Sequence, residues 1–306
     1  MEHHDPAQQR LIDGLRHQKS GRLVQALDAY RAAEQEAQEP AVRSEALRRQ
    51  SSVYRMLAEW EMALDRAREA ADIARAAKLP EQMGDALNAE AGVYIARGQY
   101  PQATSFLDAI LRTTDDARIR GVALQNLGAI AAQSGDFETA RRHFLASHEC
   151  FQEAGYVWGQ ALVLNNFARA ALDHGNFMVA ASMIENAVGA ARRVQDQDLL
   201  ALATLNHAEA IAGLRDHARA EELANAALTY FSSAGNLWRK VECLRLLGDI
   251  ADQQGNAMRA RSLYREGLGL AREIGAAVEV AQLEKRLDGS GGSAAGGGEG
   301  GGEPAA

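Results

Sequence analysis

Apolar residues recur at helical spacing along the chain, and polar residues fill the positions between them. Leu124, Leu127 and Ile130 fall on one face of a first segment, and Phe137 and Phe144 fall on one face of the next. Apolar positions three, four or seven residues apart are typical of an amphipathic α-helix. The pattern therefore predicts pairs of helices, each with one buried and one solvated face.

Two columns of small residues show that these pairs repeat. An alanine stands at one register at spacings of 37 or 40 residues: Ala26, Ala63, Ala103, Ala140, Ala180, Ala220 and Ala260. Another small residue lies twelve positions before each alanine: Gly14, Ser51, Ala91, Gly128, Ala168, Ala208 and Gly248. Two helices approach closely where both present small side chains, so each repeat is predicted to contain one helix–helix contact. Seven helical hairpins follow.

The break between the two helices of a repeat lies five positions before the alanine. In five repeats it is a glycine, namely Gly21, Gly98, Gly135, Gly175 or Gly255, and the exceptions are Ala58 and Arg215. Glycine ends a helix readily because it adopts the left-handed conformation without steric cost. Pro6, Pro40, Pro80 and Pro101 fall at predicted helix starts, where a missing amide donor costs little.

The pattern resembles the tetratricopeptide repeat (TPR) family over residues 7 to about 287. Three repeats show its small residue, alanine and aromatic residue in order: Gly14…Ala26…Tyr30, Gly128…Ala140…Phe144 and Gly248…Ala260…Tyr264. The long repeats are similar to those of kinesin light chains, and the A-G-x-x-W stretches at 154–158 and 234–238 are similar to sensor arms of bacterial transcription regulators. The resemblance implies an all-α, right-handed superhelix (an α-solenoid) whose first helices line a concave groove.

The expected domain organisation has three parts. Residues 1–6 form a flexible N-terminus, residues 7–288 form the solenoid, and the glycine-rich residues 289–306 form a disordered tail that is either a tether or an expression remnant. Residues 276–287 are expected to form a capping helix with an apolar stripe of Val280, Leu283 and Leu287.

The composition of the chain narrows the partners and the cellular location that are expected. The net charge of −8 argues against nucleic acid as the main partner. The chain has no stretch of eighteen apolar residues and no apolar signal core at its start, so a cytoplasmic protein that does not bind membranes is expected. Its two cysteines, Cys150 and Cys243, do not make a disulfide framework.

The sequence contains no phosphate-binding loop, nucleophile elbow or H-E-x-x-H helix, so neither catalysis nor a cofactor is expected. His143 and His148 are five residues apart, and a solvated surface pair is a better interpretation of this spacing than a metal site. Trp158 and Trp238 occupy the same place in two repeats, which favours packing over ligand binding.

Asparagines form the main candidate site. Asn126, Asn166 and Asn206 are spaced 40 residues apart, two positions before the small-residue column. We expect these amides to stack as a ladder on the first helices, and the family resemblance places this position against the backbone of a bound peptide. An asparagine amide offers both an acceptor and donors, which match a peptide group. Asn88 and Asn165 lie one position earlier and would widen the strip. Alternatively, the amides bond between neighbouring helices and only fix the stacking.

Charged residues suggest a direction for this groove. Arg48, Arg49 and Arg55 make its amino-terminal end basic and Arg169 continues the strip, whereas the carboxy-terminal end is acidic through Glu209, Glu242, Asp249 and Asp252. A peptide with an acidic end would then dock in one orientation. The alternative is a solvated helix face without a ligand.

The sequence thus predicts a non-catalytic scaffold that binds an extended peptide or a partner helix. The alternative is a regulatory sensor that responds to a peptide or small molecule and acts on a separate effector protein. Leu11, Ile12 and Leu15 begin the first repeat without a cap, and they suggest a homodimer through this repeat.

Overall fold

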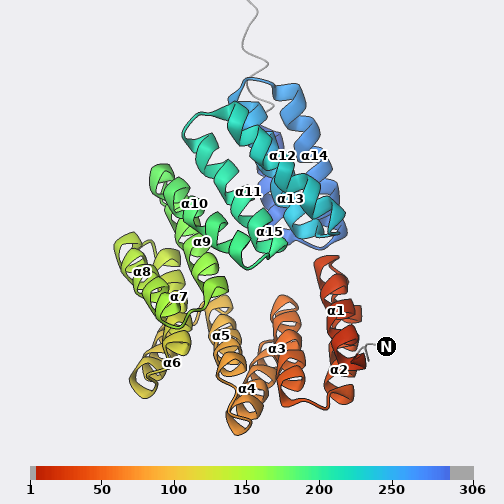
Figure 1. Cartoon of the computed structure of the whole chain (residues 1–306). Coiled ribbons are helices and arrows are strands. Elements are labelled where there is room, and N and C mark those ends of the chain that lie inside the picture. The colour runs from red at the N-terminus through yellow and green to blue at the C-terminus, as the bar shows by residue number, and fades with distance from the viewer. Residues whose placement is uncertain (1–4, 290–306) are drawn as a thin grey trace, which may run out of the picture.

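The computed structural model describes residues 5–289, and this part of the chain consists of fifteen α-helices without any strand (Figure 1). Fourteen helices form seven consecutive hairpins, and α15 follows the last one. This confirms the predicted all-α solenoid of seven hairpins with a terminal helix. No helix in the described range is both long and apolar enough to cross a membrane.

Odd-numbered helices up to α13 are the first helices of the hairpins, and even-numbered helices are the second. In chain order they are α1 (Pro6–Lys19), α2 (Leu23–Glu36), α3 (Pro40–Met56), α4 (Trp60–Ala76), α5 (Pro80–Ala96), α6 (Tyr100–Thr113), α7 (Ala117–Gln133), α8 (Phe137–Glu153), α9 (Val157–Asp173), α10 (Phe177–Arg193), α11 (Gln197–Gly213), α12 (His217–Ser233), α13 (Leu237–Gln253), α14 (Ala257–Glu273) and α15 (Ala277–Gly289). As predicted, Pro6, Pro40 and Pro80 begin their helices, and Pro101 is the second residue of α6.

Helix length explains the two repeat spacings. The second helices α2 and α6 have 14 residues, whereas the other five second helices have 17. After the two shorter helices the chain leaves through an extended residue, Ala37 or Thr114. The spacing of 37 residues occurs where a repeat lacks these three helical residues, about one turn of helix.

The left-handed turn between the helices of a hairpin does not require glycine. The five predicted glycines have φ between +69° and +79°. Ala58 and Arg215, the two exceptions in the sequence pattern, adopt the same conformation with φ of 58° and 70°. Packing of the adjacent helices therefore holds these turns in a conformation that a residue with a Cβ rarely adopts.

Glycines in the first helices accommodate aromatic rings from the second helices. A Cβ at Gly14 would lie 2.4 Å from the ring of Tyr30, and one at Gly248 would lie 2.3 Å from the ring of Tyr264. Gly128 and Phe144 make the same contact at 2.8 Å. The family-like spacing of glycine, alanine and aromatic residue thus describes one packing contact, in which the ring occupies the volume of the missing side chain.

The last helix closes the core as predicted. Leu283 of α15 is fully buried, and Val280 and Leu287 pack against the same cluster, which contains Tyr264. Of the segments expected to be flexible, residues 1–4 and 290–306 lie outside the described residues; α1 begins at Pro6 and α15 ends at Gly289.

The hairpins follow a curve that brings the first repeat back to the last ones. Consecutive first helices contact one another along the series and form the inner layer, while the second helices pack on the outside (Figure 1). At the end of α1, Lys19 forms an ion pair with Asp198 of α11. A Cβ at Gly21 would lie 3.3 Å from Cβ of Ile274, which follows α14. The first of these contacts spans 179 residues of sequence, and the second joins the first hairpin to the residue after the last hairpin.

Candidate functional site in the inner groove

A cavity of about 760 Å³ opens on the inner surface between α3, α5 and α7. We call it the N-terminal cavity. Its polar lining comprises Arg48, Ser51, Ser52 and Arg55 of α3, Asn88 of α5, Arg97 after α5, Tyr100 of α6, and Asn126 and Gln133 of α7. Its volume lies within the range of small-ligand sites, about 300–1,000 Å³. Three first helices supply most of the lining because their inner faces follow one another around the curve.

Two asparagines of neighbouring first helices form a hydrogen-bonded pair in this cavity. Nδ2 of Asn126 donates to Oδ1 of Asn88 at 2.7 Å and to the carbonyl oxygen of Val122 at 3.0 Å. Both N–H groups of Asn126 are thereby used. Among the described residues, no hydrogen bond engages Nδ2 of Asn88 or Oδ1 of Asn126. The pair thus leaves one amide donor group and one amide acceptor available at the cavity.

A second asparagine pair lies further along the solenoid. Nδ2 of Asn206 donates to Oδ1 of Asn165 at 2.9 Å, and both side chains are buried. Asn206 borders only a small cavity of about 70 Å³. Asn166 is half-buried and lines neither of these two cavities. The expected ladder of Asn126, Asn166 and Asn206 is therefore replaced by two separate pairs.

The offset of one position has a simple geometric description. In each pair the acceptor, Asn88 or Asn165, lies three positions before the small residue of its own first helix. The donor, Asn126 or Asn206, lies two positions before the small residue of the next first helix. Between the two pairs, Gln125 occupies the earlier position on α7, and its buried Oε1 has no hydrogen-bond partner among the described residues. The amides do bond between neighbouring first helices, as the stacking interpretation required, and only one pair borders a large cavity.

The position directly after the small-residue column decides where the groove is open. In the N-terminal half this position holds Leu15 in the first repeat and Ser52, Gly92 and Ala129 in the next three, and these last three line the N-terminal cavity. In the C-terminal half the same position holds a charged residue, namely Arg169, Glu209 or Asp249. Short side chains leave space above the helices, whereas long charged ones fill it.

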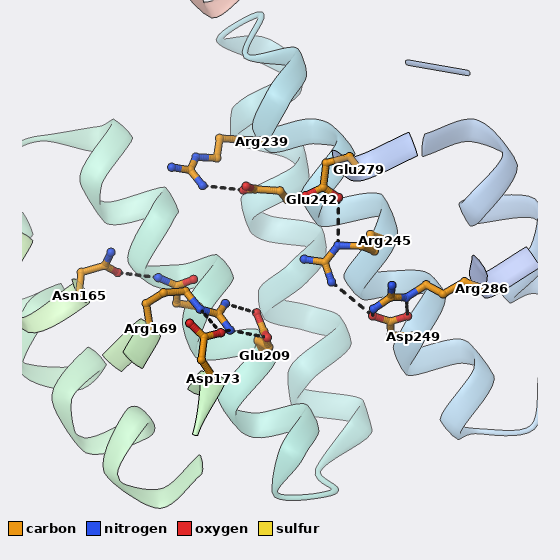
Figure 2. A network of polar contacts seen from close by, with 11 residues as sticks. Asn165, Arg169, Asp173, Glu209, Arg239, Glu242, Arg245, Asp249, Glu279 and Arg286 are labelled. Atoms are coloured by element: carbon orange, nitrogen blue, oxygen red, sulfur yellow. Dashed lines mark hydrogen bonds and ion pairs between the residues drawn. The ribbon is translucent and has the colours of Figure 1, made fainter. Parts of the chain in front are cut away.

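Charged side chains in the C-terminal half neutralise one another (Figure 2). We call this set the C-terminal ion-pair network; it comprises Arg169, Asp173, Glu209, Arg239, Glu242, Arg245, Asp249, Glu279 and Arg286. Arg169 contacts Asp173 at 2.7 Å and Glu209 at 2.6 Å, while Arg239 contacts Glu242 at 2.6 Å. Of the acidic residues expected at this end, Glu209, Glu242 and Asp249 are therefore matched by arginines, whereas Asp252 is exposed and has no ion pair among the described residues.

Two further contacts complete this network. Asp249 accepts from Arg286 of α15 at 2.5 Å, and Arg245 lies 3.3 Å from Glu279. Burial would raise the pKa of Glu209, but its hydrogen bonds and attraction to Arg169 outweigh burial, so the pKa is lowered. The carboxylate is thus held in its charged form by its partner.

Arginines near the N-terminal cavity are only partly neutralised. Arg48 and Arg49 share one carboxylate, that of Glu45, at 2.5 Å and 2.6 Å. Burial opposes ionisation of Glu45, but the two arginines lower its pKa. Arg55 and Arg97 are exposed and form no ion pair within residues 5–289. The lining contains no Asp or Glu, so a net positive charge remains.

Sequence reasoning missed several residues of this cavity. Arg97 belongs to the turn after α5 and Tyr100 begins α6; Tyr100 donates its hydroxyl to Oε1 of Gln133 at 2.9 Å across the cavity lining. Gly92 was not singled out either. Its place directly after the small-residue column, where other repeats carry a charged residue, could have been read from the sequence. Among the predicted site residues, Arg48, Arg55, Asn88 and Asn126 line this cavity; Arg169 belongs to the C-terminal ion-pair network.

The two tryptophans differ in spite of their identical register. Trp238 packs against the core cluster that contains Tyr264. Trp158 is exposed, and its Nε1 donates to Asp196 at 2.8 Å. Packing therefore accounts for Trp238, whereas Trp158 makes a polar contact at the surface.

No protein-family model and no curated protein sequence matches the chain. Solved structures do share its fold. The apo form of the quorum sensor NprR from B. thuringiensis has a TM-score of 0.60 at 18% identity, covering 81% of this chain and 71% of that one. The Rap conjugation gene regulator of plasmid pLS20, in complex with the Phr* peptide, has a TM-score of 0.60 at 14% identity, covering 89% and 75%. A tetratricopeptide repeat protein from Parabacteroides merdae has a TM-score of 0.51 at 14% identity, covering 94% and 99%. The fold is that of a TPR solenoid.

Proposed function

We propose that this protein is a non-catalytic binding module that holds an extended peptide, or a partner helix, in the N-terminal cavity. The observation that carries the proposal is the Asn88–Asn126 pair, which leaves a donor and an acceptor free beside a cavity of about 760 Å³. A peptide group presents one C=O and one N–H, so it complements these two free groups whatever its side chains are. The lining binds through hydrogen bonds and charge, and no chemistry is performed on the ligand.

The structural neighbours support a peptide as the ligand. One of them is a Rap regulator in complex with the Phr* peptide, and another is the quorum sensor NprR. The net charge of −8 disfavours nucleic acid as a partner. A homodimer through the first repeat would cover exposed apolar side chains of this hairpin, among them Ile12 on α1 and Val24 on α2. Two unpaired cysteines support a cytoplasmic location.

The test is a calorimetric titration of the full chain with a library of end-capped hexapeptides. The variant Asn88→Ala/Asn126→Ala removes the pair at the cavity, and Asn165→Ala/Asn206→Ala is the matched control because it removes the equivalent pair away from it. We expect the wild type and the control to bind the same peptides, and the first variant to lose at least about tenfold in affinity. Circular dichroism checks that both variants remain folded. Equal affinities of the two variants would contradict the site, and a library without any binding peptide would contradict the function.

A second candidate function is a sensor that changes the curvature of the solenoid and thereby acts on a separate effector. The contact between the ends of the solenoid favours it, because Lys19 and Asp198 are joined by an ion pair across a thin interface. The N-terminal cavity between α3, α5 and α7 lies on the inner side of the curve that this contact closes (Figure 1). Small-angle scattering separates the two functions: a sensor changes its radius of gyration when a library peptide binds, and a static scaffold does not.

A further inference from the structure

A second cavity lies on the outer surface of the solenoid, between the second helices α8 and α10. We call it the outer cavity; its volume is about 350 Å³, and α9 forms its floor. It shares no lining residue with the N-terminal cavity, which opens on the inner surface. Figure 1 shows α8 and α10 on the outside of the curve, so a molecule bound between them contacts two neighbouring hairpins. The outer cavity is therefore a separate place from the proposed peptide site.

A single small residue explains why the outer surface is open here. Ten positions after the alanine column, the 17-residue second helices α4, α8, α12 and α14 carry Ile73, Cys150, Tyr230 and Leu270, whereas α10 carries Ala190. Between α11 and α12, where Tyr230 takes the place of Ala190, the cavity measures only about 150 Å³. The short side chain of Ala190 thus leaves room between α8 and α10.

The outer cavity is apolar at one end and polar at the other. Leu145 of α8 and Met183 of α10 lie near the middle of their helices, and Leu164 lies near the middle of the antiparallel α9. Arg193 is the last residue of α10, and Gln160 lies in the first turn of α9. Nη2 of Arg193 is 3.5 Å from Oε1 of Gln160, so these two side chains share the polar end. A ligand that fills the cavity therefore combines an apolar body with a polar head.

The polar part of the lining offers hydrogen-bond donors and contains no Asp or Glu. Arg193 is exposed and forms no ion pair within residues 5–289, and His148 makes no hydrogen bond in this range. Burial lowers the pKa of His148, so its imidazole is neutral at pH 7 and keeps one N–H donor. A guanidinium matches a carboxylate in both charge and shape. The head group that suits this end is a carboxylate.

We propose that the outer cavity binds a small carboxylate with an aliphatic or aromatic body. Leu145, Leu164 and Met183 contact the body, and Arg193 binds the carboxylate with His148 beside it. Removal of the body from water supplies affinity, and the charge-assisted hydrogen bonds orient the head. The volume is near the lower limit of small-ligand sites, about 300 Å³, so the ligand is small. This site goes beyond the proposed peptide binding and does not depend on it.

The experiment is a calorimetric titration of the full chain with five defined probes. Hexanoate and phenylacetate carry a body and a charge, hexanamide and phenylacetamide carry the body alone, and acetate carries the charge alone. Arg193→Gln removes the charge from the cavity, and Ala190→Leu fills the cavity with the side chain that α14 carries at this register. The matched control is Arg192→Gln, because Arg192 is an exposed neighbour that lies outside the lining. Circular dichroism checks that the variants are folded.

We expect hexanoate or phenylacetate to bind at least about tenfold more tightly than its own amide and than acetate. The preference for the acid over the amide should disappear in Arg193→Gln and remain in Arg192→Gln, and Ala190→Leu should bind neither. Because a bound ligand contacts three helices of the folded chain, the tighter acid should also raise the melting temperature of the wild type.

Equal affinity for acid and amide, or a preference that survives in Arg193→Gln, would overturn the inference. Unchanged binding by a folded Ala190→Leu would overturn it as well, and Arg193→Gln still decides if Ala190→Leu does not fold. The variant Asn88→Ala/Asn126→Ala should bind the acids as the wild type does, since neither asparagine lines the outer cavity. Failure of the peptide site and failure of this site are therefore distinguishable.

Discussion

The two halves of the inner groove are built on one repeat and differ in what a single register carries. In the N-terminal half, Ser52, Gly92 and Ala129 leave a cavity of about 760 Å³, and two arginines in its lining have no ion-pair partner in the part of the chain that the structure describes. In the C-terminal half, the same register carries Arg169, Glu209 and Asp249, whose charges are paired and whose side chains leave only about 70 Å³ near Asn206. The comparison teaches that curvature alone does not make a binding site.

The asparagine pairs sharpen this comparison. Asn88–Asn126 and Asn165–Asn206 have the same donor, the same acceptor and nearly the same length, 2.7 Å and 2.9 Å. One pair faces open space and the other is enclosed, because their neighbours along the inner surface differ in size and charge. Stacking of the first helices therefore uses both pairs, whereas ligand binding has room at one.

The largest effect is expected from removing one arginine of the C-terminal ion-pair network. Arg169→Ala leaves Glu209, which is only 29% exposed, without its partner, and should lower the free energy of unfolding by about 1–3 kcal/mol. Arg55→Ala removes an unpaired arginine and should change it by less than about 0.5 kcal/mol. Urea unfolding followed by circular dichroism measures both. Equal losses for the two variants would show that the halves do not differ in the way described.

An intermediate effect is expected from giving the N-terminal half a charge of the kind found in the C-terminal half. Gly92→Glu places a carboxylate in the cavity near Arg55 and Arg97 and should stabilise α5 by about 0.5–1 kcal/mol, while peptide binding in this cavity is lost. The matched control is Gly189→Glu, because Gly189 lies inside α10 on the exposed surface and also has no atom near its Cβ position. It should stabilise similarly and leave peptide affinity unchanged. Thermal unfolding and calorimetric titration report the two quantities, and unimpaired binding by Gly92→Glu would contradict the location of the site.

The smallest effect is a difference in pH dependence, on the order of 1 kcal/mol or less. The pKa of Glu209 is lowered in the folded protein, so its contribution to stability is present above the unfolded pKa of about 4.3 and is lost as the pH falls through the folded value. Glu209→Gln should therefore reduce the loss of stability on acidification. Burial raises the pKa of Asp85 on α5 in spite of Arg48 and Arg118, so its ionised form costs stability at neutral pH.

Asp85→Asn should accordingly be more stable than the wild type at pH 7, and the advantage should vanish as the pH falls toward the unfolded pKa of about 3.9. Melting temperatures of the wild type, Asp85→Asn and Glu209→Gln between about pH 7 and about pH 3 test the opposite signs. Parallel curves for the two variants would contradict the assigned pKa directions.

Much of the fold followed from the sequence because its contacts are local. Gly128 and Phe144 meet within one hairpin, 16 residues apart, so their spacing was visible as a repeat. The expectation that Asn126 lies on the inner surface used its register in the repeat together with the family resemblance, in which the first helices line the groove. The partner of Asn126 was not predictable in this way, because the stagger of α5 against α7 decides that Asn88, one register earlier, lies within 2.7 Å.

By itself, the sequence determined seven helical hairpins and a terminal helix, since small residues and apolar stripes recur at a fixed spacing along the chain. Only the tertiary structure decided that Arg169 pairs with Glu209 while Arg55 and Arg97 form no ion pair among the described residues, and that Gly21 in the turn after α1 lies against Ile274, after α14. Charge pairing and open volume depend on the distances between successive helices and on the curvature of the whole solenoid. A repeat pattern repeats the register of residues, but it does not contain those distances.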